Sequence, residues 1–179
     1  MSKTTRKKKL KEVIIAISFR DFFFSCVDYE GFTYRTDKQK VALISKSFIN
    51  TLALMENSQD FVADFITNQT MRHRHGLKDA VKNRLKKIYV KGLKTFGFQD
   101  ELIERLLKQI LGQGEIYQCE LSNTKQYRLF YSFERKPDEN LILIRPLLLD
   151  LNHMVDPAKK KQFDHVQNFC LACLKSNCK

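Results

Sequence analysis

Hydrophobic residues recur along the chain at two different intervals, and the change comes near residue 115. Between residues 38 and 111 they recur every three or four positions, the spacing of one buried face on a helix. From residue 115 onward the interval shortens to two, which is typical of strands whose side chains alternate between the faces of a sheet. The pattern therefore predicts a helical stretch followed by a sheet.

The helical stretch predicts four helices, at about residues 38–55, 58–66, 77–96 and 100–111. Asn57 and Ser58 can cap the second, while glycines close the third and fourth. Each helix has one apolar stripe, so each is expected to pack by one side. The residues expected in the core are Val41, Ile44, Phe48, Leu52 and Met55, then Phe61, Val62, Phe65 and Ile66, then Leu77, Val81, Leu85, Ile88, Gly92 and Phe96, and finally Leu102, Ile103, Leu106, Leu107, Ile110 and Leu111.

Strand-like runs lie at both ends of the helical stretch. Residues 13–18 are β-branched and apolar enough for a strand, and the sequence "FRDFFFSC" after them fits a helix or a strand. Past residue 115, "EIYQCEL", "QYRLFYSFE" and "NLILIRPLLL" are separated by "SNTK" and "RKPDEN", which are rich in turn residues. These three runs predict an antiparallel meander. Beyond Pro157 an apolar stripe predicts a final helix.

Together these elements predict an α+β protein whose N-terminal and central helices pack on a C-terminal antiparallel meander of three to four strands, with a final helix. A length of 179 residues suits one domain with a substantial core. We expect a basic mobile tail at residues 1–11 and a single domain over residues 12–179. Its mainly helical half would end at residue 98, and residues 99–179 would supply a helix, the antiparallel sheet and the C-terminal helix.

Positive charge is concentrated in two segments of a chain whose formal net charge is +12. Residues 1–11 carry +6 and residues 71–97 carry +8, which leaves −2 for the rest. Concentrated positive charge favours a polyanionic partner, RNA or another nucleic acid first of all, although a solvated helix face is the alternative. The residues expected to contact phosphates are Arg72, Arg74, Lys78, Lys82, Lys86, Lys87 and Lys91, with Lys125 and Arg145 in the meander.

The cysteines indicate a reducing compartment. There are five, an odd number, which fits a cytoplasmic protein better than a disulfide framework, and no signal peptide or membrane span is expected. His165, Cys170, Cys173 and Cys178 have ligand types that zinc uses, but small core residues on the final helix explain the cysteines equally well. We expect no metal and no cofactor.

Arg128 places a guanidinium inside the otherwise apolar run "QYRLFYSFE". Alternation puts it on the more polar face of that strand, opposite Tyr127, Leu129 and Tyr131. Cleavage of RNA at a 2′-hydroxyl requires a base, an acid and a cation beside the crowded phosphate. Arg128 is the candidate cation, and His153, just past the third strand, is the candidate acid or base, with a structural role as its alternative.

The run from "LLKQIL" through "GEIYQCELSNTKQYRLFYSFE" and "NLILIRPLLLD" to "NHMVDP" resembles the second half of the RelE/ParE-like toxin superfamily. The resemblance covers residues 100–157, and its motif is the strand Tyr127-Arg128-Leu129-Phe130-Tyr131. It implies a curved antiparallel sheet after a helical hairpin, and metal-independent endoribonuclease activity. It also implies catalytic roles for Arg128, Tyr131 and His153, and an acidic antitoxin-like protein as a partner.

The expected function is therefore RNA binding, with RNA cleavage as the further step that the resemblance implies. One alternative is a non-catalytic nucleic-acid-binding accessory protein of a mobile element. Another is an interaction protein that applies its basic faces to acidic membranes or proteins. Salt dependence separates the classes, because contacts to phosphates release counterions and weaken steeply as salt rises.

Overall fold

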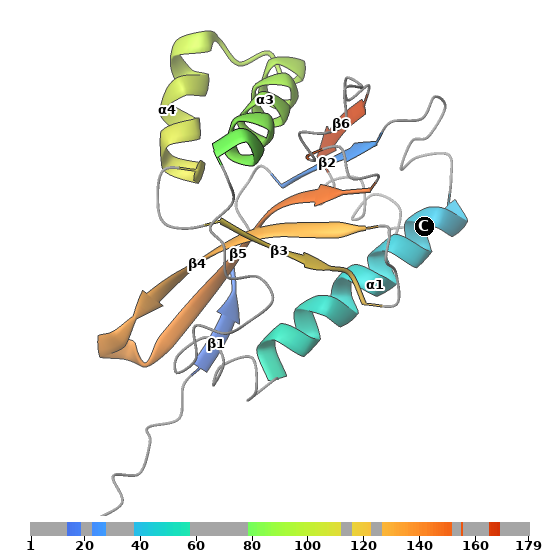
Figure 1. Ribbon diagram of the computed structural model, residues 1–179, viewed down its shortest axis with the longest axis vertical. Coiled ribbons are helices and arrows are strands. Elements are labelled where there is room, and N and C mark those ends of the chain that lie inside the picture. The colour runs from blue at the N-terminus through green and yellow to red at the C-terminus, as the bar shows by residue number, and fades with distance from the viewer. Residues whose placement is uncertain are drawn as a thin grey trace, which may run out of the picture.

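Helices cover both faces of a mixed β-sheet, so the protein has an α+β fold (Figure 1). The architecture is that of a computed structural model, which describes residues 14–18, 23–27, 38–57, 79–111, 116–122, 127–151, 155 and 165–168. The tail expected at residues 1–11 and the helix expected at residues 58–66 lie outside these ranges.

The described helices follow the apolar stripes of the sequence. They are α1 (Lys38–Asn57), α3 (Asp79–Thr95) and α4 (Asp100–Leu111). The stripe expected in α1 is buried along its whole length, because every third or fourth residue meets the sheet. Its buried apolar residues are Val41, Ile44, Phe48, Leu52 and Met55.

A tight turn ends α3 and directs the chain into α4. Gly97 adopts φ of +81°, a left-handed conformation that favours glycine. The amide of Phe98 donates to the carbonyl of Leu93 at 3.2 Å, and the amide of Gly97 donates to the carbonyl of Lys94 at 2.9 Å. These two bonds satisfy carbonyls that the end of a helix otherwise leaves unpaired, so α3 stops two residues before Gly97.

Six strands form the sheet among the described residues, in the order β3-β4-β5-β2-β6, with β1 also paired to β5. The predicted meander is confirmed, since β3, β4 and β5 pair antiparallel in succession. Both N-terminal strands pair with β5 in parallel, along the edge that β4 leaves open. The strands are β1 (Ile14–Ile17), β2 (Phe24–Val27), β3 (Ile116–Glu120), β4 (Arg128–Lys136), β5 (Leu141–Asp150) and β6 (His165–Asn168).

Two expectations about this sheet were wrong. The sheet is mixed rather than purely antiparallel, because β1 and β2 run parallel to β5. The predicted final helix is a strand where it is described, at β6, which pairs antiparallel with β2. Strand pairing supplies backbone hydrogen bonds to the open edge of β2, and this tertiary requirement outweighs the helical spacing of the sequence.

A β-bulge in β5 joins the two layers of the core. Phe130 faces Leu148 and Tyr131 faces Pro146, so Leu147 is an extra residue without an opposite number on β4. Before the bulge Ile142 and Ile144 point toward α1, whereas after it Leu149 and Leu151 do so. Leu147 and Leu148 point toward α3 and α4. The strand is therefore buried on both faces and holds the two helical layers together.

Candidate nucleic-acid interface

Helix α3 packs on the sheet by one side and is fixed there by a buried hydrogen bond. The hydroxyl of Tyr89 donates to the carbonyl of Leu147 at 2.5 Å. That carbonyl belongs to the bulge residue of β5, so the bond satisfies a group at an interruption of the ladder. The residues of α3 that are buried against the sheet and α4 are Leu85, Ile88, Tyr89, Gly92 and Leu93.

Close packing at Gly92 brings α3 onto β2. A Cβ on this residue would lie 3.0 Å from the ring of Phe24, which is fully buried. The same ring meets Tyr89 edge-on, with centroids 5.2 Å apart. Since such tightly packed contacts leave little room for movement, the opposite side of α3 is held in a fixed orientation.

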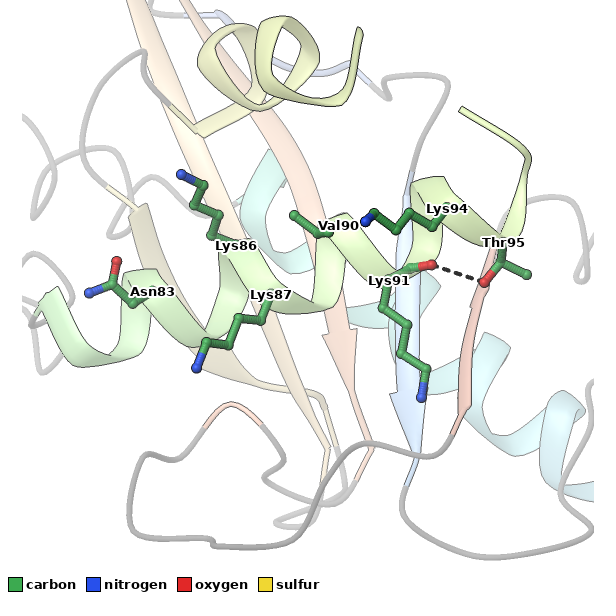
Figure 2. Close-up of a pocket in the computed structure, with 7 residues that line it drawn as sticks. All are labelled: Asn83, Lys86, Lys87, Val90, Lys91, Lys94 and Thr95. Atoms are coloured by element: carbon green, nitrogen blue, oxygen red, sulfur yellow. Dashed lines mark hydrogen bonds between the residues drawn. The ribbon is translucent and has the colours of Figure 1, made fainter. Parts of the chain in front are cut away.

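The exposed side of α3 carries lysines in two rows around a shallow hollow of about 890 Å³. Figure 2 shows Lys86 and Lys94 pointing to one side with Val90 between them, and Lys87 and Lys91 pointing to the other. Within each row the residues are four apart, which places them one above the next on a helix. The residues lining the hollow, which we call the lysine face, are Asn83, Lys86, Lys87, Val90, Lys91, Lys94 and Thr95.

The charge of α3 is almost entirely positive. Its sequence has six basic residues, and its one acid, Asp79, lies in the first turn. At least four of the bases project from the lysine face, where they can reach a surface that lies along the helix. Ammonium groups in such a series attract phosphates as point charges and specify no base.

The structure brings three of the predicted phosphate contacts together on this face: Lys86, Lys87 and Lys91. Lys82 is half-buried and does not line the hollow, while Lys94 joins the face although it was not among the predicted contacts. Its spacing of four and eight residues from Val90 and Lys86 was the signal that could have found it. The other predicted contacts Arg72, Arg74, Lys78 and Lys125 lie outside the described residues.

Arg145 is already engaged within the sheet. Its guanidinium forms an ion pair with Glu134 at 2.5 Å, and the arginine side chain is only 20% exposed. The two residues lie on β5 and β4, diagonally across the ladder. A phosphate at Arg145 would have to displace this carboxylate, so Arg145 is a weaker candidate for a phosphate contact than the lysines of α3.

Arg128 lies at the start of β4, between two acidic residues of the neighbouring strands. Its register partners are Glu120 on β3 and Asp150 on β5. Asp150 is 1% exposed and accepts the amide of Val155 at 2.8 Å. The sheet face that carries Arg128 is not fully exposed to solvent, because Phe130, two residues on, is buried beneath α3 and α4. Arg128 itself is half-buried.

Tyr131 lies in the core rather than at a surface that RNA could reach. Its side chain is fully buried on the α1 side of the sheet and stacks on Tyr117, with ring centroids 5.8 Å apart. Burial, followed by the nearby charges of Cys119 and Tyr117, raises the pKa of its hydroxyl well above the ordinary range. Arg128 and Tyr131 project from opposite faces of β4, so the structure does not bring these two candidates together. His153 lies outside the described residues.

Cys119 of β3 lies on the same side of the sheet as Tyr131. Burial, with a smaller effect of the Glu120 carboxylate, raises the pKa of its thiol to about 12. The thiol is therefore protonated at neutral pH and is a poor nucleophile or metal ligand. Across the described ranges no three histidine, cysteine or acidic residues form a metal-binding group, and the cysteines suggested for zinc lie outside these ranges.

Comparison with known sequences places the chain in a family. Residues 18–177 match the family described as Uncharacterised protein UU032. The chain belongs to this family. No curated protein and no solved structure matches it. In the part of the chain that the structure describes, no helix is long and apolar enough to cross a membrane.

Proposed function

We propose that this protein binds nucleic acid, RNA first of all, through phosphate contacts from the lysine face of α3. The observation that supports the proposal most strongly is the grouping of Lys86, Lys87, Lys91 and Lys94 around one shallow hollow. The side of α3 opposite this face is fixed on the sheet by Tyr89 and Gly92, so the lysines project from a rigid support.

The geometry favours the backbone of a nucleic acid over its bases. From Lys86 to Lys94 the helix rises about 12 Å, at about 1.5 Å per residue, so several phosphates of one strand can lie along it. Lysine lacks the planar fork with which arginine reads guanine, and among the described residues the only uncharged polar ones that line the hollow are Asn83 and Thr95. Binding should therefore depend strongly on salt and little on sequence.

RNA cleavage stays a prediction that rests on the resemblance to the RelE/ParE-like superfamily. The burial of Tyr131 argues against a catalytic role for this residue, because its hydroxyl is not at the surface. Arg128 keeps a half-buried position at the start of β4 and remains the residue of that set to substitute. An acidic protein would compete with RNA for the same lysines.

The proposal is tested by measuring affinity for labelled RNA between about 50 and 200 mM salt, with the full chain and two triple variants. The first variant changes Lys86, Lys87 and Lys91 to glutamine. The second is a matched control that changes three lysines of α1, on the other side of the sheet, by the same total charge. These control positions are Lys38, Lys40 and Lys46.

The α3 variant should reduce the slope of log affinity against log salt by about 2 to 3, because each phosphate contact contributes about 0.7 to 0.9. The α1 control should change the slope by much less. Equal losses in the two variants would mean that only net charge matters, and the absence of binding by the unmodified chain would refute the proposal outright. RNA cleavage in the same samples, if abolished by Arg128→Ala, would support the enzymatic reading.

A further inference from the structure

We propose that Asp100, at the start of α4, restrains nucleic-acid binding by holding the ammonium group of Lys94. The inference rests on the proposed function and concerns the border of the lysine face. The Nζ atom of Lys94 lies 2.9 Å from Oδ1 of Asp100. A carboxylate oxygen at this distance takes the position that a phosphate oxygen would take.

The pair forms because the turn after α3 brings two oppositely polarised helix ends together. Lys94 is in the last turn of α3, where unpaired carbonyls favour a cation. Asp100 is in the first turn of α4, where unpaired amides favour an anion. Gly97 allows the short connection between them. The ion pair thus follows from the geometry of the turn between α3 and α4 as well as from the two charges.

The pair is exposed, so a polyanion can compete for it. The side chains of Lys94 and Asp100 are 54% and 79% exposed. Ion pairs between exposed groups are weak, because water and salt screen them. Asp100 therefore reduces the availability of Lys94 without removing it from the surface.

Two further acids of α4 lie near the lysine face. A second hollow of about 690 Å³ lies between the helices and is lined by Lys86 of α3 and by Glu101 and Glu104 of α4, with basic residues beside them. The row of Lys86 and Lys94 thus lies toward a region of mixed charge. Lys87 projects to the other side of α3 (Figure 2). Nucleic acid should consequently lie toward the Lys87 side, and α4 should form its border.

The test is a double-mutant cycle on RNA affinity with Asp100→Asn, Lys94→Gln and both together in the full chain. Asparagine is close to aspartate in size and is equally well tolerated at the start of a helix, so α4 should remain folded, which circular dichroism checks. Glu56→Gln serves as the control, because it removes an exposed acid from α1, on the other face of the sheet.

Asp100→Asn should tighten RNA binding and raise the salt slope by about 0.7 to 0.9, as one added phosphate contact does. The gain in affinity should then be about three-fold larger near 50 mM than near 200 mM salt. In the Lys94→Gln background the gain should disappear, and Glu56→Gln should give no comparable change.

Two results would overturn the inference while leaving the proposed function intact. One is an unchanged affinity for Asp100→Asn in a chain that binds RNA through α3. The other is a gain that persists without Lys94, since it would then come from net charge alone. If the unmodified chain binds no RNA at all, the proposed function fails and the inference fails with it.

Discussion

The two fully buried tyrosines offer a direct measure of how α3 is fixed to the sheet. Tyr89 donates a hydrogen bond to the carbonyl of Leu147 at 2.5 Å. The hydroxyl of Tyr131 is also buried, yet among the described residues it has no hydrogen-bond partner. Replacing each tyrosine by phenylalanine removes one oxygen atom from the core and leaves the aromatic ring in place. The two substitutions should therefore differ in their effects on the free energy of unfolding.

Tyr89→Phe should lower the free energy of unfolding by about 1 to 3 kcal/mol, because it leaves the Leu147 carbonyl buried without a donor. Tyr131→Phe should be neutral or stabilising, since it removes a buried polar atom that gains no hydrogen bond. In a protein of this size 1 kcal/mol corresponds to roughly 2 to 4 °C in Tm. The Tm of the Tyr89 variant should thus fall by several degrees, and that of the Tyr131 variant should not.

Urea denaturation followed by circular dichroism gives both free energies, and thermal melts provide the independent check. Comparing the slopes of the urea transitions shows whether each variant still unfolds in one step. Equal losses for the two variants would refute the reasoning, because they would show that the Tyr89 bond contributes nothing beyond the presence of a hydroxyl. A large loss for Tyr131→Phe would show that its hydroxyl has a partner after all.

Three further predictions concern packing, a side-chain hydrogen bond and pH. Gly92→Ala should lower the free energy of unfolding by up to about 2 kcal/mol in urea denaturation. Overpacking against Phe24 costs about 1 to 3 kcal/mol, and the gain in helix propensity offsets about 1 kcal/mol of that cost. In a Phe24→Leu background the loss should be smaller. Thr51→Val should cost about 1 kcal/mol or more, because Oγ1 of Thr51 accepts the amide of Ser122 at 2.7 Å, whereas Thr51→Ser should retain most of the stability. Because burial raises the pKa of Cys119 to about 12, its thiol stays protonated in the folded protein while the unfolded chain ionises. The contribution of this thiol to the free energy of unfolding should be fully present below the ordinary thiol pKa and should be lost as pH rises toward 12, by at most about 1.4 kcal/mol per pH unit. Cys119→Ala should remove that part of the loss in denaturation curves measured from neutral to alkaline pH.

Local periodicity predicted the helices because each one buries at least one apolar stripe. The expected helix at residues 38–55 is α1, extended by two residues, and its stripe is buried as expected. The buried residues of α3 differ more from the predicted stripe. Phe96 is 46% exposed because the helix ends before it, while Tyr89 and Leu93, on the flank of the stripe, are fully buried. A helix that touches the sheet and a second helix buries a wider surface than one stripe.

Local sequence patterns predicted the meander of the sheet but not the pairing of its N-terminal strands. Short connections in the sequence separate β3, β4 and β5, and these neighbouring runs pair with each other. The pairing of β1 and β2 with β5 spans more than a hundred residues, and no turn residue encodes it. One available signal was the nearly continuous apolar run of β5, which is typical of a strand buried on both faces.

Some features of the candidate site follow from local sequence patterns, and others depend on the tertiary structure. Helical spacing predicts that the lysines of α3 lie outside its apolar stripe, and Lys86, Lys87 and Lys91 line the hollow on the exposed side. The acid beside Lys94 depends on the geometry of the turn after α3, which periodicity does not describe. For Tyr131, alternation gave the correct face of β4, but it could not show that α1 covers that face.

The extra residue at Leu147 also matters to anyone who compares or redesigns members of this family. Even-numbered positions of β5 before the bulge and odd-numbered positions after it share the α1 side. An alignment that slides by one position across Leu147 would exchange the inward and outward sets of half the strand, even though every aligned residue would still be apolar. Substitution patterns in β5 must therefore be read separately on the two sides of this residue, as if it were two short strands.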